Sequence, residues 1–154
     1  MYQYRQGCAA DLPWLQLAAA AAGWESLSPE ERAQIHPALV AQRAALQCRQ
    51  VLATPGGALI VAQQGLQPVG YLLLVVAPDG STEEPTALLI DLWVHPAHRR
   101  RGVGSGLLAA AERGVAGLGM RKIKLWTGLH HRPAVEFALS RGFSPAGLIG
   151  VKDL

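Results

Sequence analysis

The sequence predicts a single α/β domain with a mixed central sheet, an antiparallel meander, one βαβ crossover and helices on both faces. Three apolar runs, at 58–64, 69–77 and 87–94, are separated by polar turns, which is typical of a meander. An amphipathic segment then leads from the third run to another short strand, as a crossover requires. At 154 residues, half of them apolar, the chain has the length of one domain, which we place at 1–154.

The first part of the chain predicts a strand followed by two or three helices. Residues 2–6 alternate like a short edge strand, and a helix is expected from Asp11, acting as its cap, to Trp24. Ser28 and Glu31 form a capping box with proline at the first helical position, which begins a second helix. A further stretch compatible with a helix follows and ends at TPGG, before the meander.

The second part predicts a helix, a strand, a short helix and an abbreviated last strand. The strand is expected at 123–127 and the short helix at 133–140. After that helix the chain is short, so the last strand pair is either abbreviated or completed by a partner chain. The longer helix is expected from Val103 to Leu118, where glycines close it. Its apolar residues fall at helical spacing: Val103, Leu107, Leu108, Ala111, Val115 and Leu118.

Composition excludes several classes of protein. No apolar run approaches the ~18 residues of a membrane span, and the N-terminus does not read as a signal peptide, so we expect a cytoplasmic protein with no membrane partner. Cys8 and Cys48 match no metal spacing, so no metal site is expected, and a disulfide is not expected in a reducing compartment.

Charge is divided unevenly along the chain. Residues 1–94 hold 4 arginines against 8 acids, whereas residues 95–154 hold 10 basic residues against 3 acids. This pattern favours a basic site for one anionic ligand beside an acidic site for a cation, rather than a nucleic-acid surface.

The stretch HRRRGVGSGLL at 98–108 lies between a buried strand and an amphipathic helix. Backbone amides converge at such a helix N-terminus and bind phosphates, aided by the helix dipole. A Walker A loop fails because no lysine follows Gly106. A dinucleotide fingerprint fails because the spacing is GxGxG and no acid follows at the required distance.

The stretch instead resembles the pyrophosphate-binding motif [QR]xxGx[GA] of the GNAT superfamily of acyl-CoA-dependent N-acetyltransferases, with Arg99, Gly102 and Gly104 on its fixed positions. Downstream, HRPAVEFALSRGF is similar to the family's NxxAxxFYxxxGF segment. The start of the chain looks like the family's first strand and helix, so the resemblance spans nearly the whole sequence. It implies a GNAT-like fold and acetyl transfer from acetyl-CoA to a primary amine, of a small molecule or of a peptide or protein.

The resemblance also implies a coenzyme A site. The pantetheine arm would lie where the strand at 88–94 and the strand at 123–127 splay apart. Glycine at two positions of the loop lets the backbone approach the diphosphate, and three arginines supply positive charge. The expected cofactor-binding residues are Leu92, Trp93, Val94, Arg99, Arg100, Arg101, Gly102, Val103, Gly104, Ser105, His131, Ala134 and Phe137.

Three residues are candidates for catalysis. The family's oxyanion contact, a backbone N–H, maps onto Val94. Asp91, an acid in an apolar strand, is the candidate base or amine-binding group, with a structural aspartate as the alternative. The family's tyrosine that protonates the leaving sulfur is replaced by Ala138, and Tyr71 is a candidate substitute, or a residue of ordinary strand packing.

The acceptor is expected to be a cationic amine. In this family the first helices and the meander loop form much of the acceptor pocket. Here those segments carry six acids, although such charges also occur on solvated surfaces. The acids are Glu25, Glu30, Glu31, Asp79, Glu83 and Glu84. A homodimer is a further expectation, and no nucleic-acid partner is expected. Two alternatives stay open, a non-catalytic acyl-CoA-binding module and, more remotely, a nucleic-acid-binding domain.

Overall fold

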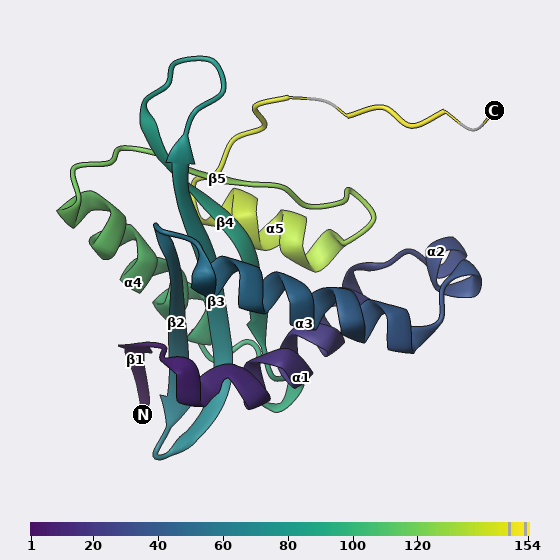
Figure 1. Cartoon of the computed structure of the whole chain (residues 1–154), viewed down its shortest axis with the longest axis horizontal. Helices are drawn as coiled ribbons and strands as arrows, with labels where there is room; N and C mark the ends of the chain where they lie inside the picture. The colour runs from purple at the N-terminus through teal and green to yellow at the C-terminus, as the bar shows by residue number, and fades with distance from the viewer. Residues whose placement is uncertain (148, 153) are drawn as a thin grey trace.

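The computed structural model describes residues 1–147, 149–152 and 154 and places one five-stranded sheet between helices (Figure 1). The first four strands pair antiparallel in sequence order, and the fifth pairs parallel with the fourth. This confirms the predicted mixed sheet with a meander and one crossover. The strands are β1 (Tyr2–Gln6), β2 (Gly57–Gln64), β3 (Gln67–Pro78), β4 (Pro85–Val94) and β5 (Ile123–Leu125).

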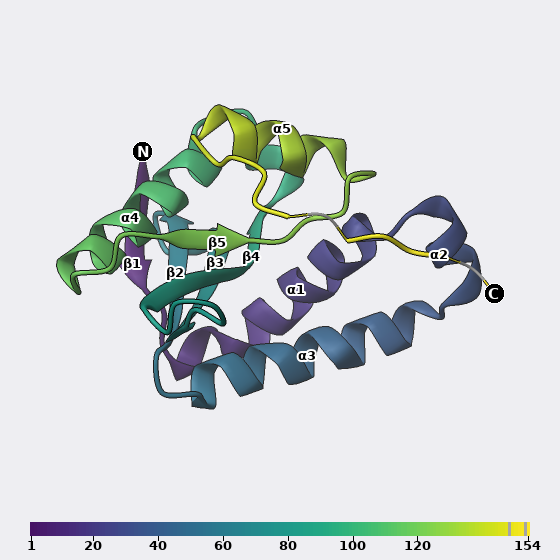
Figure 2. The ribbon, with the colours of Figure 1, turned by 90° about the horizontal axis from the view of Figure 1, so that it is seen from above.

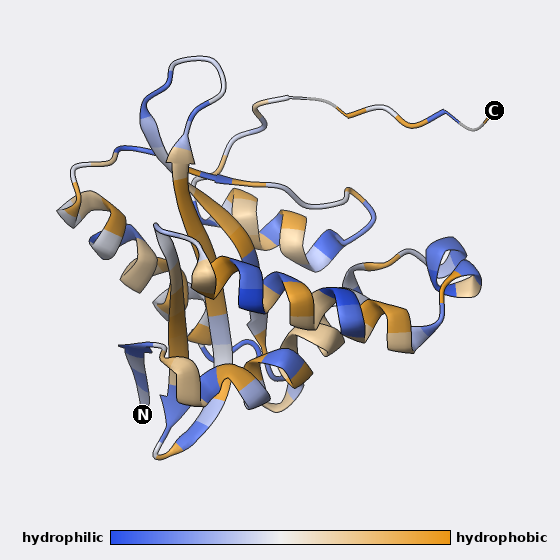
Figure 3. Cartoon of the chain, viewed as in Figure 1, coloured by the Kyte–Doolittle hydropathy of each residue, from blue (hydrophilic) through white to orange (hydrophobic). Residues whose placement is uncertain are grey.

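Helices cover both faces of the sheet, as predicted. Seen from above in Figure 2, α1 and α3 lie on one side of the sheet, and α4 and α5 lie on the other. Hydrophobic colouring is concentrated along the inner strands, whereas α2 is mainly hydrophilic (Figure 3). The helices are α1 (Leu12–Ser26), α2 (Pro29–Gln34), α3 (Pro37–Ala53), α4 (Val103–Gly117) and α5 (Arg132–Ser140).

Local capping explains where the first helices begin. Ser28 accepts a hydrogen bond from the Glu31 amide, and Glu31 accepts one from the Ser28 amide, so the predicted capping box of α2 is confirmed. Asp11 is the N-cap residue of α1, as predicted, but its side chain makes no capping hydrogen bond to the helix. Its carboxylate accepts from the Cys8 amide and from both terminal nitrogens of Arg5, which ties the turn before α1 to β1.

Two hydrophobic clusters hold the layers together. The first, between the sheet and α1 with α3, contains Leu15, Ala18, Ala19, Ala22, Cys48, Val51, Leu59, Val61, Tyr71, Leu73 and Trp93. The second, between the sheet and α4, contains Ala62, Val69, Leu72, Leu74, Ala87, Val103, Leu107, Leu108, Ala111 and Val115. Small residues on α1 allow it to pack closely against α3 and the sheet. Five of the six apolar positions predicted for α4 are therefore buried.

Three sequence predictions need correction. Leu118 is 74% exposed because α4 ends at Gly117, one residue before it. β5 is a three-residue strand rather than the five residues expected. The described residues after α5 form no strand, so they do not build the abbreviated last strand of the prediction.

The described part of the chain has no helix long and apolar enough to cross a membrane.

Candidate active site

The candidate site begins where β4 and β5 stop pairing. The two strands pair in parallel from Ala87 opposite Ile123 to Leu89 opposite Leu125, where the pairing ends. β4 continues to Val94 with no described strand on that side. The two strands therefore separate in the region where the sequence analysis placed their divergence.

Backbone groups of β4 point into this divergence. His95 donates a backbone hydrogen bond of 2.8 Å to the Val69 carbonyl, and Val94 lies opposite Gly70 in the antiparallel register. Directly opposed residues of two antiparallel strands alternate between hydrogen-bonded and non-hydrogen-bonded pairs. Because His95 and Val69 form a hydrogen-bonded pair, Val94 and Leu92 belong to non-hydrogen-bonded pairs with their partners on β3. Their N–H and C=O groups consequently point away from β3, toward the side on which β5 has separated.

A β-bulge in β4 determines which face carries Asp91. Leu73 pairs with Asp91 but Leu74 pairs with Leu89, so Ile90 is the extra residue of the bulge. Leu89 packs into the second cluster, and uninterrupted alternation would place Asp91 on the same face. The bulge instead brings the Asp91 carboxylate to Tyr71, on the face covered by α1 and α3.

Asp91 and Tyr71 form a hydrogen-bonded pair. The fully buried Tyr71 hydroxyl donates to Oδ2 of Asp91. Burial raises the pKa of Asp91 from an ordinary 3.8 to about 6, while hydrogen bonds from the Tyr71 hydroxyl and the Leu92 amide oppose the rise. Burial, and then the Asp91 charge, raise the pKa of Tyr71. Asp91 is thus an ionisable carboxyl that titrates near neutrality, and Tyr71 is its donor rather than an accessible acid.

The N-terminus of α4 offers free backbone donors beside the divergence. Its N-cap, Gly102, has φ +83°, a left-handed conformation that glycine adopts without strain, and supplies no side-chain cap. No described residue accepts a hydrogen bond from the amides of Val103, Gly104 or Ser105. A Cβ on Gly104 would lie 3.4 Å from Phe137 and 3.7 Å from Leu92, so glycine keeps this approach to β4 narrow but open.

The three arginines of the loop differ in their contacts. Arg99 donates from Nε to the Val94 carbonyl at 2.8 Å and from Nη2 to Oε2 of Glu25 at 2.6 Å. Arg100 and Arg101 are exposed, and no ion pair joins them to the described residues. The Trp93 side chain lies on the opposite face, in the first cluster, where its indole N–H donates to Oε1 of Glu25 at 3.3 Å. Only its backbone, therefore, lies near the divergence.

The loop before α5 forms the other side of the divergence. His131 is the N-cap of α5. Its pKa is lowered, mainly by burial, which favours the neutral imidazole at pH 7. His130 contacts the Ser26 carbonyl at 2.7 Å, which links this loop to the end of α1. Phe137 packs against the second cluster, Ala134 is half-buried, and Ala138 is 6% exposed.

Two features of the site were not predicted from the sequence. Glu25 appeared only as one of several acids, yet it joins α1 to Arg99 and Trp93. Gly106 had no predicted role, yet a Cβ there would come within 2.0 Å of the Tyr4 ring, so its smallness serves the packing of α4 against β1. Both depend on tertiary contacts that have no local sequence signal.

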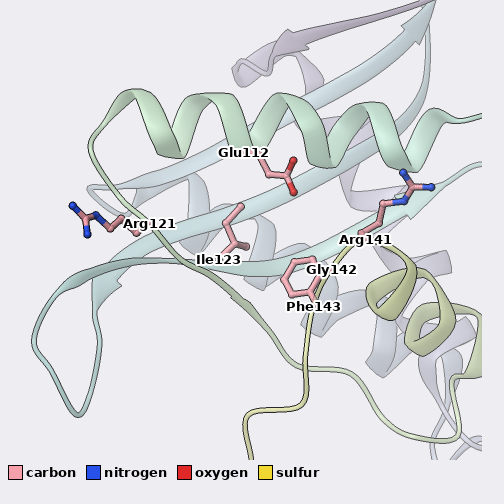
Figure 4. A pocket seen from close by; sticks show the side chains of 6 residues that line it. All are labelled: Glu112, Arg121, Ile123, Arg141, Gly142 and Phe143. Atoms are coloured by element: carbon pink, nitrogen blue, oxygen red, sulfur yellow. The ribbon is translucent and has the colours of Figure 1, made fainter.

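A separate open hollow lies between the second half of α4, the start of β5 and the end of α5 (Figure 4). Glu112 and Arg121 line it together with Phe143. Glu112 is ten residues from Gly102, or about 15 Å along the helix at 1.5 Å per residue. None of the predicted site residues lines this hollow.

Comparison with known proteins identifies the family. The acetyltransferase (GNAT) family model matches residues 18–143. Mycothiol acetyltransferase of Kineococcus radiotolerans is 45% identical over 58 residues, which are 38% of this chain and 17% of that protein. The chain thus spans only a small part of this relative's length.

Solved structures share the fold. A Pyrococcus furiosus protein described as an acetyl transferase matches with a TM-score of 0.84 and 21% identity, over 100% of both chains. An aminoglycoside acetyltransferase from an uncultured soil metagenomic sample, in complex with sisomicin, matches with a TM-score of 0.72 and 20% identity, over 99% of this chain and 95% of that one. An aminoglycoside N-acetyltransferase in complex with CoA also matches with a TM-score of 0.72 and 20% identity, over 100% of this chain and 95% of that one. Because the family model covers most of its length, the chain belongs to the GNAT family of acetyltransferases, which confirms the predicted family and its class, acyl-CoA-dependent N-acetyltransferases.

Proposed function

We propose that this protein transfers the acetyl group of acetyl-CoA to a primary amine, and that the divergence of β4 and β5 is where the transfer takes place. The observation that carries the proposal is the geometry of β4 beyond Leu89. Its Leu92 and Val94 backbone groups face the divergence, next to free amides of α4, while the Asp91 side chain lies on the sheet face covered by α1 and α3. One strand therefore separates a cofactor side from an acceptor side.

The residues present fit an acyl-CoA. The free amides at the start of α4 and the positive helix end suit a diphosphate, and Arg100 and Arg101 add unpaired charge. The Leu92 carbonyl would accept a hydrogen bond from an amide of the pantetheine arm as in a neighbouring strand, whereas the Leu92 N–H donates to Asp91 and the Val94 carbonyl accepts from Arg99. Ser105 and the neutral His131 would contribute polar contacts, and the side chains of Ala134 and Phe137 would bound the arm.

Asp91 is proposed to take a proton from the acceptor. An alkyl ammonium has a pKa near ~10.4, so the amine must lose a proton before it attacks. A carboxylate with a pKa near 6 is ionised at neutral pH and can accept that proton directly or through water. Acetyl-CoA supplies an acetyl thioester whose carbonyl oxygen gains negative charge on attack, and the Val94 N–H would donate to it.

No residue needs to protonate the leaving sulfur. Ala138 stands where a tyrosine is usual, and the fully buried Tyr71 hydroxyl is committed to Asp91. A coenzyme A thiol resembles a cysteine thiol, with a pKa near ~8.5, so it can leave as the thiolate close to neutral pH. We expect the sulfur to leave unassisted or to be protonated by water.

The acceptor is proposed to be a cationic amine. Glu25 brings a half-exposed carboxylate to the acceptor side, and one structural neighbour holds the aminoglycoside sisomicin. A screen of CoA release with polyamines, aminoglycosides, amino acids and peptides identifies the acceptor. A chain that binds CoA firmly but releases none with any amine would favour the alternative, a non-catalytic acyl-CoA-binding module.

Replacement of Gly104 by glutamate tests the cofactor site. The new side chain and its charge would stand between α4, Leu92 and Phe137, where the diphosphate and arm are expected. Calorimetric titration with CoA should show binding by the wild type and none by Gly104→Glu, at an unchanged circular dichroism spectrum. Gly117→Glu, at the far end of the same helix with no atom near its Cβ position, is the matched control and should keep its affinity. Unchanged CoA affinity in Gly104→Glu would remove the assignment.

A further inference from the structure

Glu25 holds together three parts of the site. One carboxylate oxygen lies 3.3 Å from the Trp93 indole nitrogen, and the other lies 2.6 Å from Nη2 of Arg99. Arg99 in turn donates to the Val94 carbonyl. The first arginine of the phosphate motif is therefore paired with a carboxylate at the C-terminal end of α1 rather than pointing freely into solvent.

Glu25 lies on the acceptor side of β4. Its contact with Trp93 puts it on the face that carries Tyr71 and Asp91. The next residue, Ser26, contacts His130 through its carbonyl at 2.7 Å, so Glu25 also lies near the loop before α5. The carboxylate is thus within electrostatic reach of both walls of the site.

We propose that the diphosphate of CoA takes Arg99 from Glu25, and that the released Glu25 carboxylate then binds the ammonium group of the acceptor. This inference rests on the proposed function and names the residue that selects a cationic acceptor. The Arg99 and Glu25 side chains are 41% and 35% exposed, and ion pairs at such exposure are weak and readily exchanged. A diphosphate carries more charge than one carboxylate and is also bound by the amides of α4, so it competes well for the guanidinium.

The exchange makes the two ligands help one another. Binding of CoA removes the internal partner of Glu25, and binding of an ammonium removes the internal partner of Arg99. Each ligand should therefore raise the affinity for the other by the same factor, since coupling between sites is reciprocal. Arg99 can move toward the diphosphate by rotation about its side-chain carbon–carbon bonds, which carries the whole planar guanidinium away from Glu25.

A double-mutant cycle read by CoA calorimetry tests the exchange without any turnover. Glu25→Gln should bind CoA roughly twofold to fivefold more tightly than the wild type, which is the range expected from loss of an exposed competing charge. Arg99→Gln should bind CoA more weakly, and adding Glu25→Gln to it should change nothing further. Glu136→Gln, which removes one exposed negative charge on α5, should leave the affinity unchanged.

Two results would overturn the proposal. One is a CoA affinity in Glu25→Gln equal to or weaker than that of the wild type. The other is an equal gain in the Arg99→Gln background, because the gain would then be a general effect of charge. Failure of the wild type to bind CoA would instead overturn the proposed function, so the two failures are distinguishable.

A spectroscopic readout reports on Glu25 directly. In ¹H–¹⁵N spectra, the Trp93 indole N–H signal, assigned with Trp93→Phe, should move on addition of CoA in the direction that Arg99→Gln moves it without CoA, because in both cases the carboxylate that accepts from the indole loses its Arg99 partner. A signal that stays in place would mean that Arg99 does not leave Glu25. With the amine identified by the screen, Glu25→Gln should raise KM for the amine while CoA affinity rises, two changes of opposite sign that a merely structural defect would not produce.

Discussion

Asp91 and Tyr71 form the most constrained pair of residues in the site. The pKa of Asp91 is raised from 3.8 to about 6, which means that the folded state favours its neutral form. This preference stabilises the folded state fully below pH 3.8, and the contribution is lost as the pH rises through 6. At neutral pH the ionised carboxylate lowers stability, which is consistent with a group retained for chemistry.

Replacement of Asp91 by asparagine should separate activity from stability. We expect turnover to fall by roughly 10²–10⁴, the contribution of a positioned base, at unchanged CoA affinity. At pH 8 the variant should be more stable than the wild type by roughly 1–3 kcal/mol, because it carries no buried charge, and the difference should vanish near pH 4. Steady-state rates and urea unfolding at both pH values measure this. A less stable variant with normal activity would make Asp91 a structural aspartate.

Asp11→Asn is the matched control, with the opposite sign. The hydrogen bonds from Arg5 lower the pKa of Asp11 to about 2, so this carboxylate stabilises the fold above pH 3.8 and the contribution is lost as the pH falls toward 2. Asparagine there should lower stability at pH 8 and leave the chemistry of the site unchanged.

Replacement of Tyr71 by phenylalanine should shift the pH dependence of turnover rather than abolish it. The hydroxyl lowers the pKa of Asp91, so its loss should move the acidic limb of the rate profile upward, by about one pH unit. At pH 8.5, where Asp91 is ionised in both proteins, the rates should agree within a few-fold. A hundredfold loss at every pH with normal CoA affinity would instead make Tyr71 the acid that replaces the missing tyrosine.

At the scale of one element, α4 uses its glycines in unlike ways. Gly102 begins the helix in a left-handed conformation, Gly104 leaves room near Leu92 and Phe137, and Gly106 leaves room for Tyr4. Gly114 has no atom within 4 Å of its Cβ position. The spacing of glycines in the sequence indicated a phosphate loop, but only the packing shows which of them the loop requires.

Alanine substitutions in α4 should reveal this division. Gly114→Ala should stabilise the protein by about 0.5–1 kcal/mol, since alanine favours the helix and meets nothing. Gly106→Ala should destabilise it by about 1–3 kcal/mol, because a methyl group would overlap the Tyr4 ring. Thermal unfolding checks both, and equal stability of the two variants would contradict the packing role of Gly106.

The predictability of the elements follows from where their signals lie. The meander and α4 were predictable because apolar spacing repeats locally along the sequence. The bulge at Ile90 was not, since an extra residue in a strand is visible only against the partner strand. Asp91 was therefore recognised as a candidate from its residue type, while its face, its bond to Tyr71 and the role of Glu25 required the tertiary structure.

At the scale of the whole molecule, the sheet ends in an open edge. Among the described residues β5 pairs only with β4, and near it Trp126 and Leu129 are 72% and 80% exposed. The described C-terminal residues also expose Ile149 and Val151. An open edge with apolar neighbours favours pairing with another chain.

We therefore expect a homodimer in solution, joined near this edge. Light scattering after size exclusion should give twice the mass of one chain at micromolar concentration, and Trp126→Lys should reduce it to the mass of a single chain. Leu66→Lys, at a leucine that is 98% exposed in the β2–β3 turn, is the control and should stay dimeric. A wild type of single-chain mass at high concentration would contradict the expectation.

The bulge in β4 also bears on how the two substrates meet. Asp91 and the Val94 amide are three residues apart on one strand that is paired along its length to β3. The proposed proton acceptor and the proposed oxyanion donor thus share one rigid support, and thermal motion of the helices around them would carry neither away from the other. Alignment of the reacting groups would then require no closing of domains: each substrate needs only to reach its own side of the same strand.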